Sequence, residues 1–173
     1  MKPFTLLPLA LVFAAACSDS GQDTQSPLGP SFASKSNPHF IASATDAAVN
    51  PNPDLSVDFK ISGVGSGVTV NVTVSAQANL FQDCVNNGGK QPSAANKHFD
   101  ATPVSETLPL TATAGGNIEA TFTLEFPAAT LSCPNGQTLI TEGFWSNVAI
   151  SAPVPSSGKT LVYSFPGTFS VTP

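Results

Sequence analysis

The chain has 173 residues, enough for one domain of ordinary size together with a targeting segment and a tether. Charged residues make up 10% of the chain and hydrophobic residues 41%, so a core can form beneath a surface with few charges. All the basic residues are lysines and the formal net charge is -5, which excludes the cationic surface that nucleic acids require. Glycine-rich phosphate loops are also absent, so we expect neither a nucleic-acid nor a nucleotide partner.

The first 16 residues have the layout of a secretory signal peptide. Lys2 supplies a basic start, an apolar run extends to Phe13, and three alanines follow it. The apolar run is too short to cross a bilayer as a helix. Cys17 comes directly after the alanines, and this arrangement resembles the lipobox of bacterial lipoproteins, with Ala14 where that family usually has leucine.

The resemblance implies that residues 1–16 are removed and that acyl chains on Cys17 anchor the protein to a membrane. An ordinary secretory signal with a cysteine beside its cleavage site is the alternative. Ser18 is not the aspartate linked to inner-membrane retention in some bacteria, so we expect an exported protein of the outer membrane or cell surface. Residues 17–38 are rich in serine, glycine and proline, which predicts a flexible tether.

Residues 39–173 show repeated alternation of apolar and polar side chains, which predicts strands with one buried face. No segment has a helical period. We therefore expect an all-β domain: a single antiparallel β-sandwich of seven to eight strands, immunoglobulin-like or related, with a closed barrel as the alternative. Two glycine-rich segments, 63–67 and 114–117, are predicted to be hairpin turns. The predicted strands are 40–45, 55–62, 68–75, 107–113, 118–126, 143–152 and 160–165, with 169–172 extending the last.

Cys84 and Cys133 remain once Cys17 is assigned to the lipid. Export places them in an oxidising compartment, so we predict that they form a disulfide. The closed loop of about 50 residues would stabilise the fold by about 4 kcal/mol. The bridge is expected to clamp loop 85–102 to loop 132–137, and a free reactive thiol is the alternative.

The stretch from Cys84 to Lys97 resembles one in small secreted bacterial proteins of unassigned function, where strands and a second cysteine also follow. The resemblance reaches Cys133 and implies the disulfide, but no activity.

Loop 85–102 is the strongest candidate for ligand recognition, because loops of this length are either functional or disordered. Its asparagines and glycines would also suit turns without any ligand. His98 and Asp100 would point the same way in an extended segment, so they could be in contact. The candidate ligand residues are Asn86, Asn87, Lys90, Asn96, Lys97, His98 and Asp100.

An oxygen-rich segment precedes the second predicted strand and is a weak candidate for calcium, which takes six to eight oxygen ligands. The segment lacks the glycine and the closing glutamate of an EF-hand loop, and Asx-Pro sequences make turns without a metal. No other metal and no cofactor are expected, because histidine and methionine are scarce. The calcium candidates are Asp46, Asn50, Asn52 and Asp54, with Asp58 nearby.

Trp145 is the only tryptophan, and two interpretations compete. An exposed indole near Tyr163 or Phe99 could be an aromatic platform that stacks on a sugar. A buried indole would fill the sandwich, as in immunoglobulin domains, and burial is the prediction.

The sequence offers little support for an enzyme. It has no G-x-S-x-G nucleophile motif, and glycosidase chemistry would need two opposed carboxylates, for which Asp100, Glu106 and Glu142 would have to share a cleft. We therefore expect a non-enzymatic cell-envelope lipoprotein whose sandwich binds an envelope protein or glycan, or has a structural role. The alternatives are a carbohydrate-binding module, with or without calcium, and a glycan-acting envelope enzyme.

Overall fold

The computed structural model describes residues 37–86 and 97–171. The chain divides into two compact units, 1–32 and 33–173, and every described residue belongs to the second. The described elements are β1 (His39–Phe40), the 3-10 helix η1 (Ala42–Ala44), β2 (Asp46–Val49), β3 (Leu55–Ser62), β4 (Thr69–Asn86), β5 (Lys97–Thr111), β6 (Ile118–Leu124), β7 (Gln137–Val154), β8 (Lys159–Ser164) and β9 (Phe169–Val171).

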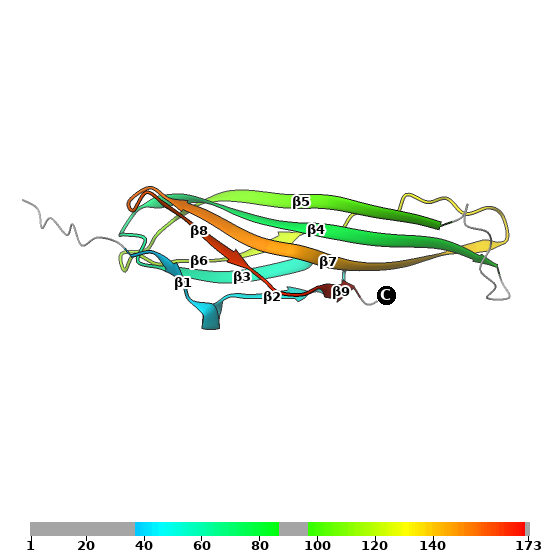
Figure 1. Cartoon of the computed structure of the whole chain (residues 1–173), viewed down its shortest axis with the longest axis horizontal. Helices are drawn as coiled ribbons and strands as arrows, with labels where there is room; N and C mark the ends of the chain where they lie inside the picture. The colour runs from blue at the N-terminus through cyan, green and yellow to red at the C-terminus, as the bar shows by residue number, and fades with distance from the viewer. Residues whose placement is uncertain (1–36, 87–96, 172–173) are drawn as a thin grey trace, which may run out of the picture. The chain divides into compact units, whose positions relative to one another are not determined.

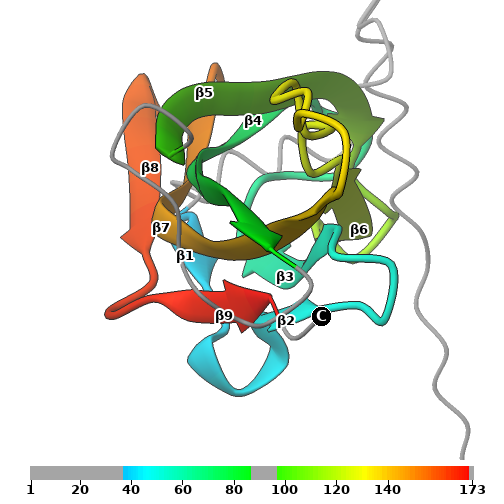
Figure 2. The ribbon, with the colours of Figure 1, turned by 90° about the vertical axis from the view of Figure 1, so that its right-hand side faces the viewer.

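Two antiparallel sheets pack face to face (Figures 1 and 2). Sheet A has β3 in its centre, with β6 on one side and β1 and β2 on the other. Sheet B has the order β5-β4-β7, and β8 and β9 pair with different stretches of β7. The predicted antiparallel β-sandwich is confirmed. The described residues form nine strands: the run predicted at 40–45 consists of the end of β1 and the 3-10 helix η1, and the strand β2 after it was not predicted.

The core lies between the sheets and follows from the alternation in the sequence. Every second residue of β3, from Leu55 to Ile61, is buried, and the residues between them are more exposed. The ring of Phe122 on β6 packs 5.7 Å from the ring of Phe59. Each fully buried side chain of this size contributes about 1.5–3 kcal/mol to folding. Alternate apolar residues on strands of both sheets therefore hold the sandwich together.

The two glycine-rich segments are not hairpin turns, so that prediction is wrong. Residues 63–67 connect β3 of sheet A to β4 of sheet B, and residues 112–117 connect β5 of sheet B to β6 of sheet A. Both segments therefore cross between sheets, and they contact each other: Val64 N–H donates to the carbonyl oxygen of Gly116 at 3.0 Å. Alternation identifies a strand, but it does not show which sheet the strand joins.

The strands of sheet B are much longer than those of sheet A. β4 and β7 each have 18 residues and β5 has 15, whereas β3 has 8 and β6 has 7. Figure 1 shows β4, β5 and β7 continuing past the ends of β3 and β6. We call residues 79–86, 97–101 and 137–144, which pair with one another, the extension of sheet B. The remainder of β4, β5 and β7, which packs on sheet A, is the base.

The segment 125–136 between β6 and β7 contacts the inner face of the extension. The predicted disulfide joins Cys84 of β4 to Cys133 of this segment, with their Cα atoms 5.6 Å apart. The pairing is confirmed, but its position differs from the prediction: Cys84 is buried within a strand that continues to Asn86, so the bridge fastens a strand to a connection. The disulfide thus covers a part of sheet B that sheet A does not reach.

Candidate functional site

The outer face of sheet B changes its chemistry between the base and the extension. In the base, Thr73 of β4 lies opposite Thr107 of β5, and their hydroxyl oxygens are 2.8 Å apart. In the extension, the same two strands place Phe81 opposite Phe99, with ring centroids 4.6 Å apart. Both pairs face away from sheet A, so burial in the core does not account for the change.

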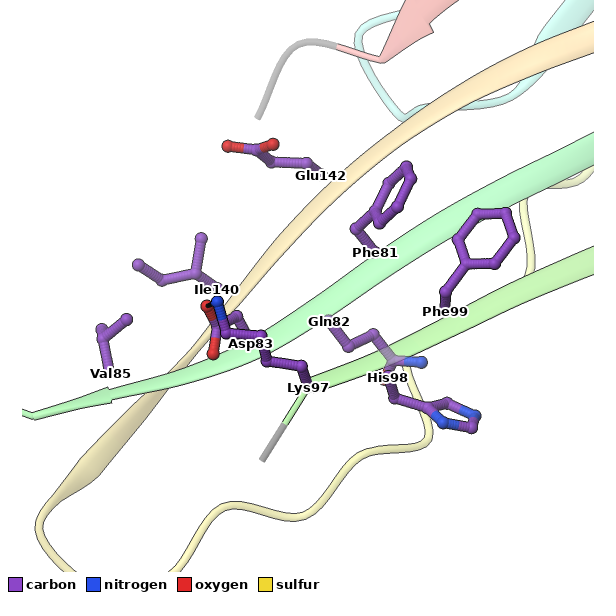
Figure 3. A pocket seen from close by; sticks show the side chains of 9 residues that line it. All are labelled: Phe81, Gln82, Asp83, Val85, Lys97, His98, Phe99, Ile140 and Glu142. Carbon is purple, nitrogen blue, oxygen red and sulfur yellow. Dashed lines mark ion pairs between the residues drawn. The ribbon is translucent and has the colours of Figure 1, made fainter. Parts of the chain in front are cut away.

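The aromatic pair lines a hollow of about 400 Å³ on this outer face (Figure 3). Phe81 is 47% exposed, Phe99 is 50% exposed, and Ile140 of β7 is 45% exposed. Val85 completes the apolar lining. A volume of several hundred Å³ with apolar walls and a few polar groups is typical of a ligand site.

Three charged side chains border the hollow. Lys97 Nζ lies 3.5 Å from Asp83 Oδ2, and Glu142 projects from β7 on the side of Phe81 (Figure 3). The other oxygen of Asp83, Oδ1, is buried and has no hydrogen-bond partner within the described part of the chain. Glu142 is exposed and forms no ion pair with any residue that the structure describes. The hollow therefore offers carboxylate acceptors beside an apolar surface.

The aromatic rings stand beside one another across the strands. The ring of Phe81 is 4.6 Å from that of Phe99 and 6.2 Å from that of Phe144, with interplanar angles of 35° and 28°. Because β4 lies between β5 and β7, Phe81 is stacked between the other two rings. A sugar platform needs an open ring face, so the centre of this row suits apolar side chains better than a pyranose.

Trp145 is completely buried, which confirms the predicted burial and removes Trp145 as an aromatic platform. Its indole Nε1–H donates to the carbonyl oxygen of Pro53 at 3.0 Å. The ring of Phe126 packs edge-on against it, with centroids 5.2 Å apart. The indole thus joins β7 to the turn before β3 and fills the end of the core.

The predicted contact between His98 and Asp100 is present, with His98 Nε2 and Asp100 Oδ1 2.9 Å apart. Gln82, which is 1% exposed, donates through Nε2 to Asp100 Oδ2 at 2.8 Å. The other end of the Gln82 amide, Oε1, accepts hydrogen bonds from the backbone N–H groups of Thr130 and Leu131 at 2.8 and 2.7 Å. This network holds segment 125–136 on the inner face, which is a structural role.

The predicted recognition loop is shorter than expected, because β4 continues to Asn86 and β5 begins at Lys97. Lys97 lines the outer hollow, and His98 also borders it (Figure 3), but the imidazole of His98 bonds to Asp100 in the inner network. The predicted group is therefore divided between two faces. Asn87, Lys90 and Asn96 lie outside the described residues.

The oxygen-rich residues proposed for calcium are spread along the β2–β3 ribbon. Asn52 Nδ2 donates to Asp54 Oδ2 at 2.8 Å in the turn, and Asp54 Oδ1 accepts from Phe126 N–H at 2.9 Å. Asp46 lies at the other end of β2, opposite Asp58. Asn50 begins the turn through a backbone bond to Asp54. Within the described residues, no three His, Cys, Asp or Glu side chains are grouped as metal ligands.

The three carboxylates considered for glycan chemistry do not share a cleft. Glu142 borders the outer hollow, Asp100 belongs to the inner network, and Glu106 lies six positions further along β5, opposite Val74 in the base. No pair among them flanks a common space in the part of the chain that the structure describes.

Phe81 and Ile140 were not among the predicted site residues, and Phe99 and Glu142 were considered only for a sugar platform and for glycan chemistry. A signal was present: the odd-numbered positions of β4 are polar throughout the base but become apolar at Phe81 and Val85 in the extension. Ending the predicted strand at residue 75 hid this change of face.

Among the described residues, no helix is long and apolar enough to span a membrane. The residues for which a signal peptide and a lipobox are predicted lie outside the described part of the chain.

No protein-family model matches the chain, and no curated protein sequence matches it. Among solved structures, it is similar to Spo0M, the sporulation control protein of Bacillus subtilis, with a TM-score of 0.32 and 9% identity. The alignment covers 77% of this chain and 47% of that one, so the chain spans less than half the length of that protein. A likeness this remote supports no conclusion about function.

Proposed function

We propose that the chain is a non-enzymatic binding protein of the bacterial cell envelope, exported by residues 1–16 and anchored through acyl chains on Cys17. Its binding surface is the outer face of the extension. The observation that carries this proposal is the change from Thr73–Thr107 to Phe81–Phe99 along one pair of strands. Exposed apolar surface of this kind marks interaction sites, because the fold does not require it.

The chain enters the domain at the end opposite the hollow. The backbone of Asn37 lies against Gly63, where an added Cβ would come within 2.6 Å of the Asn37 carbonyl oxygen. Gly63 begins the crossover that leads into Thr69, the first residue of β4. Phe81 is twelve positions further along β4, which corresponds to about 40 Å of strand. A tether ending at residue 38 would therefore leave the hollow free to meet a partner.

The double variant Phe81→Thr/Phe99→Thr tests the binding surface, because it copies the Thr73–Thr107 pair of the base. Cys17→Ser is included in every chain so that no lipid of its own contributes to membrane association. We expect the affinity for isolated envelope fragments, measured by co-sedimentation, to fall about tenfold or more. Val162→Thr on β8, where the valine is 64% exposed, is the matched control and should bind normally. Equal binding by the double variant would refute this surface.

The anchor is tested separately in cells that express the unaltered chain. Incorporation of a clickable palmitate analogue should depend on Cys17, and Cys17→Ser should release the protein from the membrane fraction. Continued acylation of the Cys17→Ser chain would show that the lipid is attached elsewhere.

A further inference from the structure

We infer that the edge of β7 at residues 137–142 binds an extended polypeptide of a partner protein as an added β-strand. This rests on the proposed function and names the ligand class for the same end of sheet B. On one side, β7 pairs with β4 along this whole stretch. On the other side, β9 pairs with residues 143–145 and β8 with residues 149–154. Among the described residues, no strand pairs with this side of residues 137–142.

At this edge the backbone of Leu139 and Thr141 is available for pairing, whereas the N–H of Gln137 is already bonded. Gln137 N–H donates to the carbonyl oxygen of Pro134 at 3.1 Å, on the side away from β4. Because backbone direction alternates along a strand, the N–H and C=O groups of Leu139 and Thr141 point to that same side. Neither N–H has a protein acceptor among residues 37–86 and 97–171 outside the β4 ladder. A peptide backbone is the ligand that matches such a row of donors and acceptors.

The two long edges of sheet B differ in how they are protected. The edge strand β5 carries Pro103 and Pro109, which have no backbone N–H, and begins with Lys97. Prolines and lysines of this kind prevent the addition of another strand. Residues 137–142 of β7 contain neither, and Thr138, Ile140 and Thr141 are β-branched residues that favour strand pairing. The β5 edge is protected against an added strand and the β7 edge is not, so a partner strand should pair with β7.

A groove runs beside the open edge. It has a volume of about 370 Å³ and is lined by Thr141 and Gly143 of β7, by Pro53 and residues 127–129, and by Val171 of β9. An added strand that follows the line of β9 would place alternate side chains in this largely apolar groove. The side chains between them would lie on the outer face of sheet B, beside those of β7 and next to the aromatic hollow.

Charge complementarity specifies the partner further. Glu142 lies on the outer face and opposite Phe81, and its carboxylate has no ion-pair partner among the residues described. The whole chain carries a formal charge of -5. A basic side chain on the added strand beside Glu142 would gain an opposite charge there. The partner segment is therefore extended, apolar at alternate positions and basic on the opposite face.

The probe is a fluorescent peptide that has valine at every second position and lysine or threonine at the positions between. It is titrated into the full chain carrying Cys17→Ser. We expect a dissociation constant of about 10–100 μM by fluorescence anisotropy. Amide NMR shifts should be concentrated at residues 137–142 and not on the β5 edge. A peptide of the same sequence with N-methyl groups at alternate backbone nitrogens should bind about tenfold more weakly or not at all, because it lacks donors.

Thr141→Pro removes one outward N–H and should weaken binding of the unmodified peptide about tenfold. The N-methylated peptide tests the same hydrogen bonds on the native chain, so a folding defect in the variant cannot decide the result. Replacing the peptide lysines with glutamates should weaken binding to the parent chain about fivefold. The Glu142→Gln variant should bind the lysine and glutamate peptides equally. Any of three results would overturn the inference: equal binding of the unmodified and N-methylated peptides, amide NMR shifts confined to β5, or no binding at a peptide concentration of about 1 mM. Loss of envelope binding in Phe81→Thr/Phe99→Thr would still support the proposed function, so the two failures are distinguishable.

Discussion

The base and the extension are built from the same three strands but are stabilised differently. In the base, alternate residues of β4 from Val70 to Ala78 are buried against sheet A. In the extension, segment 125–136 takes the place of sheet A and is fastened by the Cys84–Cys133 bridge and by the hydrogen bonds of Gln82. The comparison shows that a β-sandwich can project part of one sheet beyond its partner when a few local interactions replace a shared core.

The outer faces differ for another reason. A threonine ladder on the base solvates a sheet with few charges, whereas the aromatic row on the extension exposes apolar surface. Exposed aromatic rings are not needed for a buried core, and the proposed binding role rests on this difference between the two faces.

The largest effect is expected in the base. Phe122→Ala removes a ring that is 1% exposed and packs on Phe59, so it should lower the free energy of unfolding by about 3–5 kcal/mol. Urea denaturation followed by circular dichroism measures this change. A loss below about 1 kcal/mol would mean that the base does not depend on its shared core.

Removing the disulfide should affect the extension first. Cys84→Ala/Cys133→Ala should reduce the free energy of unfolding by about 2–4 kcal/mol. Amide hydrogen exchange should become faster in residues 80–86, 125–136 and 137–142, while the valine-rich part of β4 stays protected. Equal acceleration in the base would break the distinction between the two regions.

A smaller effect is expected from the buried amide. Gln82→Met leaves the N–H groups of Thr130 and Leu131 without their acceptor and should cost about 1–3 kcal/mol. Gln77→Met is the matched control on the same strand: Gln77 makes an exposed hydrogen bond to Asn147, and its loss should cost less than about 0.5 kcal/mol. If the two variants lose the same stability by urea denaturation, the Gln82 network does not hold the segment.

The sequence was most informative where one face of a strand is buried and the other is wet. Residues 55–62 alternate without interruption, and β3 has the predicted bounds. β4 was predicted to end at residue 75 but extends to Asn86. The prediction ended too early because the alternation of apolar and polar residues is interrupted: Asn79 and Leu80 are both buried, and Gln82 is a buried polar residue. The two N–H groups that donate to Gln82 lie 48 and 49 positions away and the carboxylate that accepts from it lies 18 positions away, which no local pattern reveals.

The candidate site was predictable only in part. The Cys84–Cys133 pair was predicted from thiol chemistry and from the expected export of the chain, without any knowledge of the fold. The hollow depends on register, since Phe81 meets Phe99 only when β4 and β5 pair as one long ladder. Trp145 was correctly predicted to be buried because a large indole suits a sandwich core better than its surface.

The aromatic row on the extension is proposed to serve binding and not stability. The most direct measurement compares Phe81→Thr/Phe99→Thr with the parent chain in two assays, urea denaturation and co-sedimentation with envelope fragments. The claim predicts a change in unfolding free energy below about 1 kcal/mol together with a loss of affinity of about tenfold or more. A loss of stability above about 2 kcal/mol with unchanged binding would contradict it.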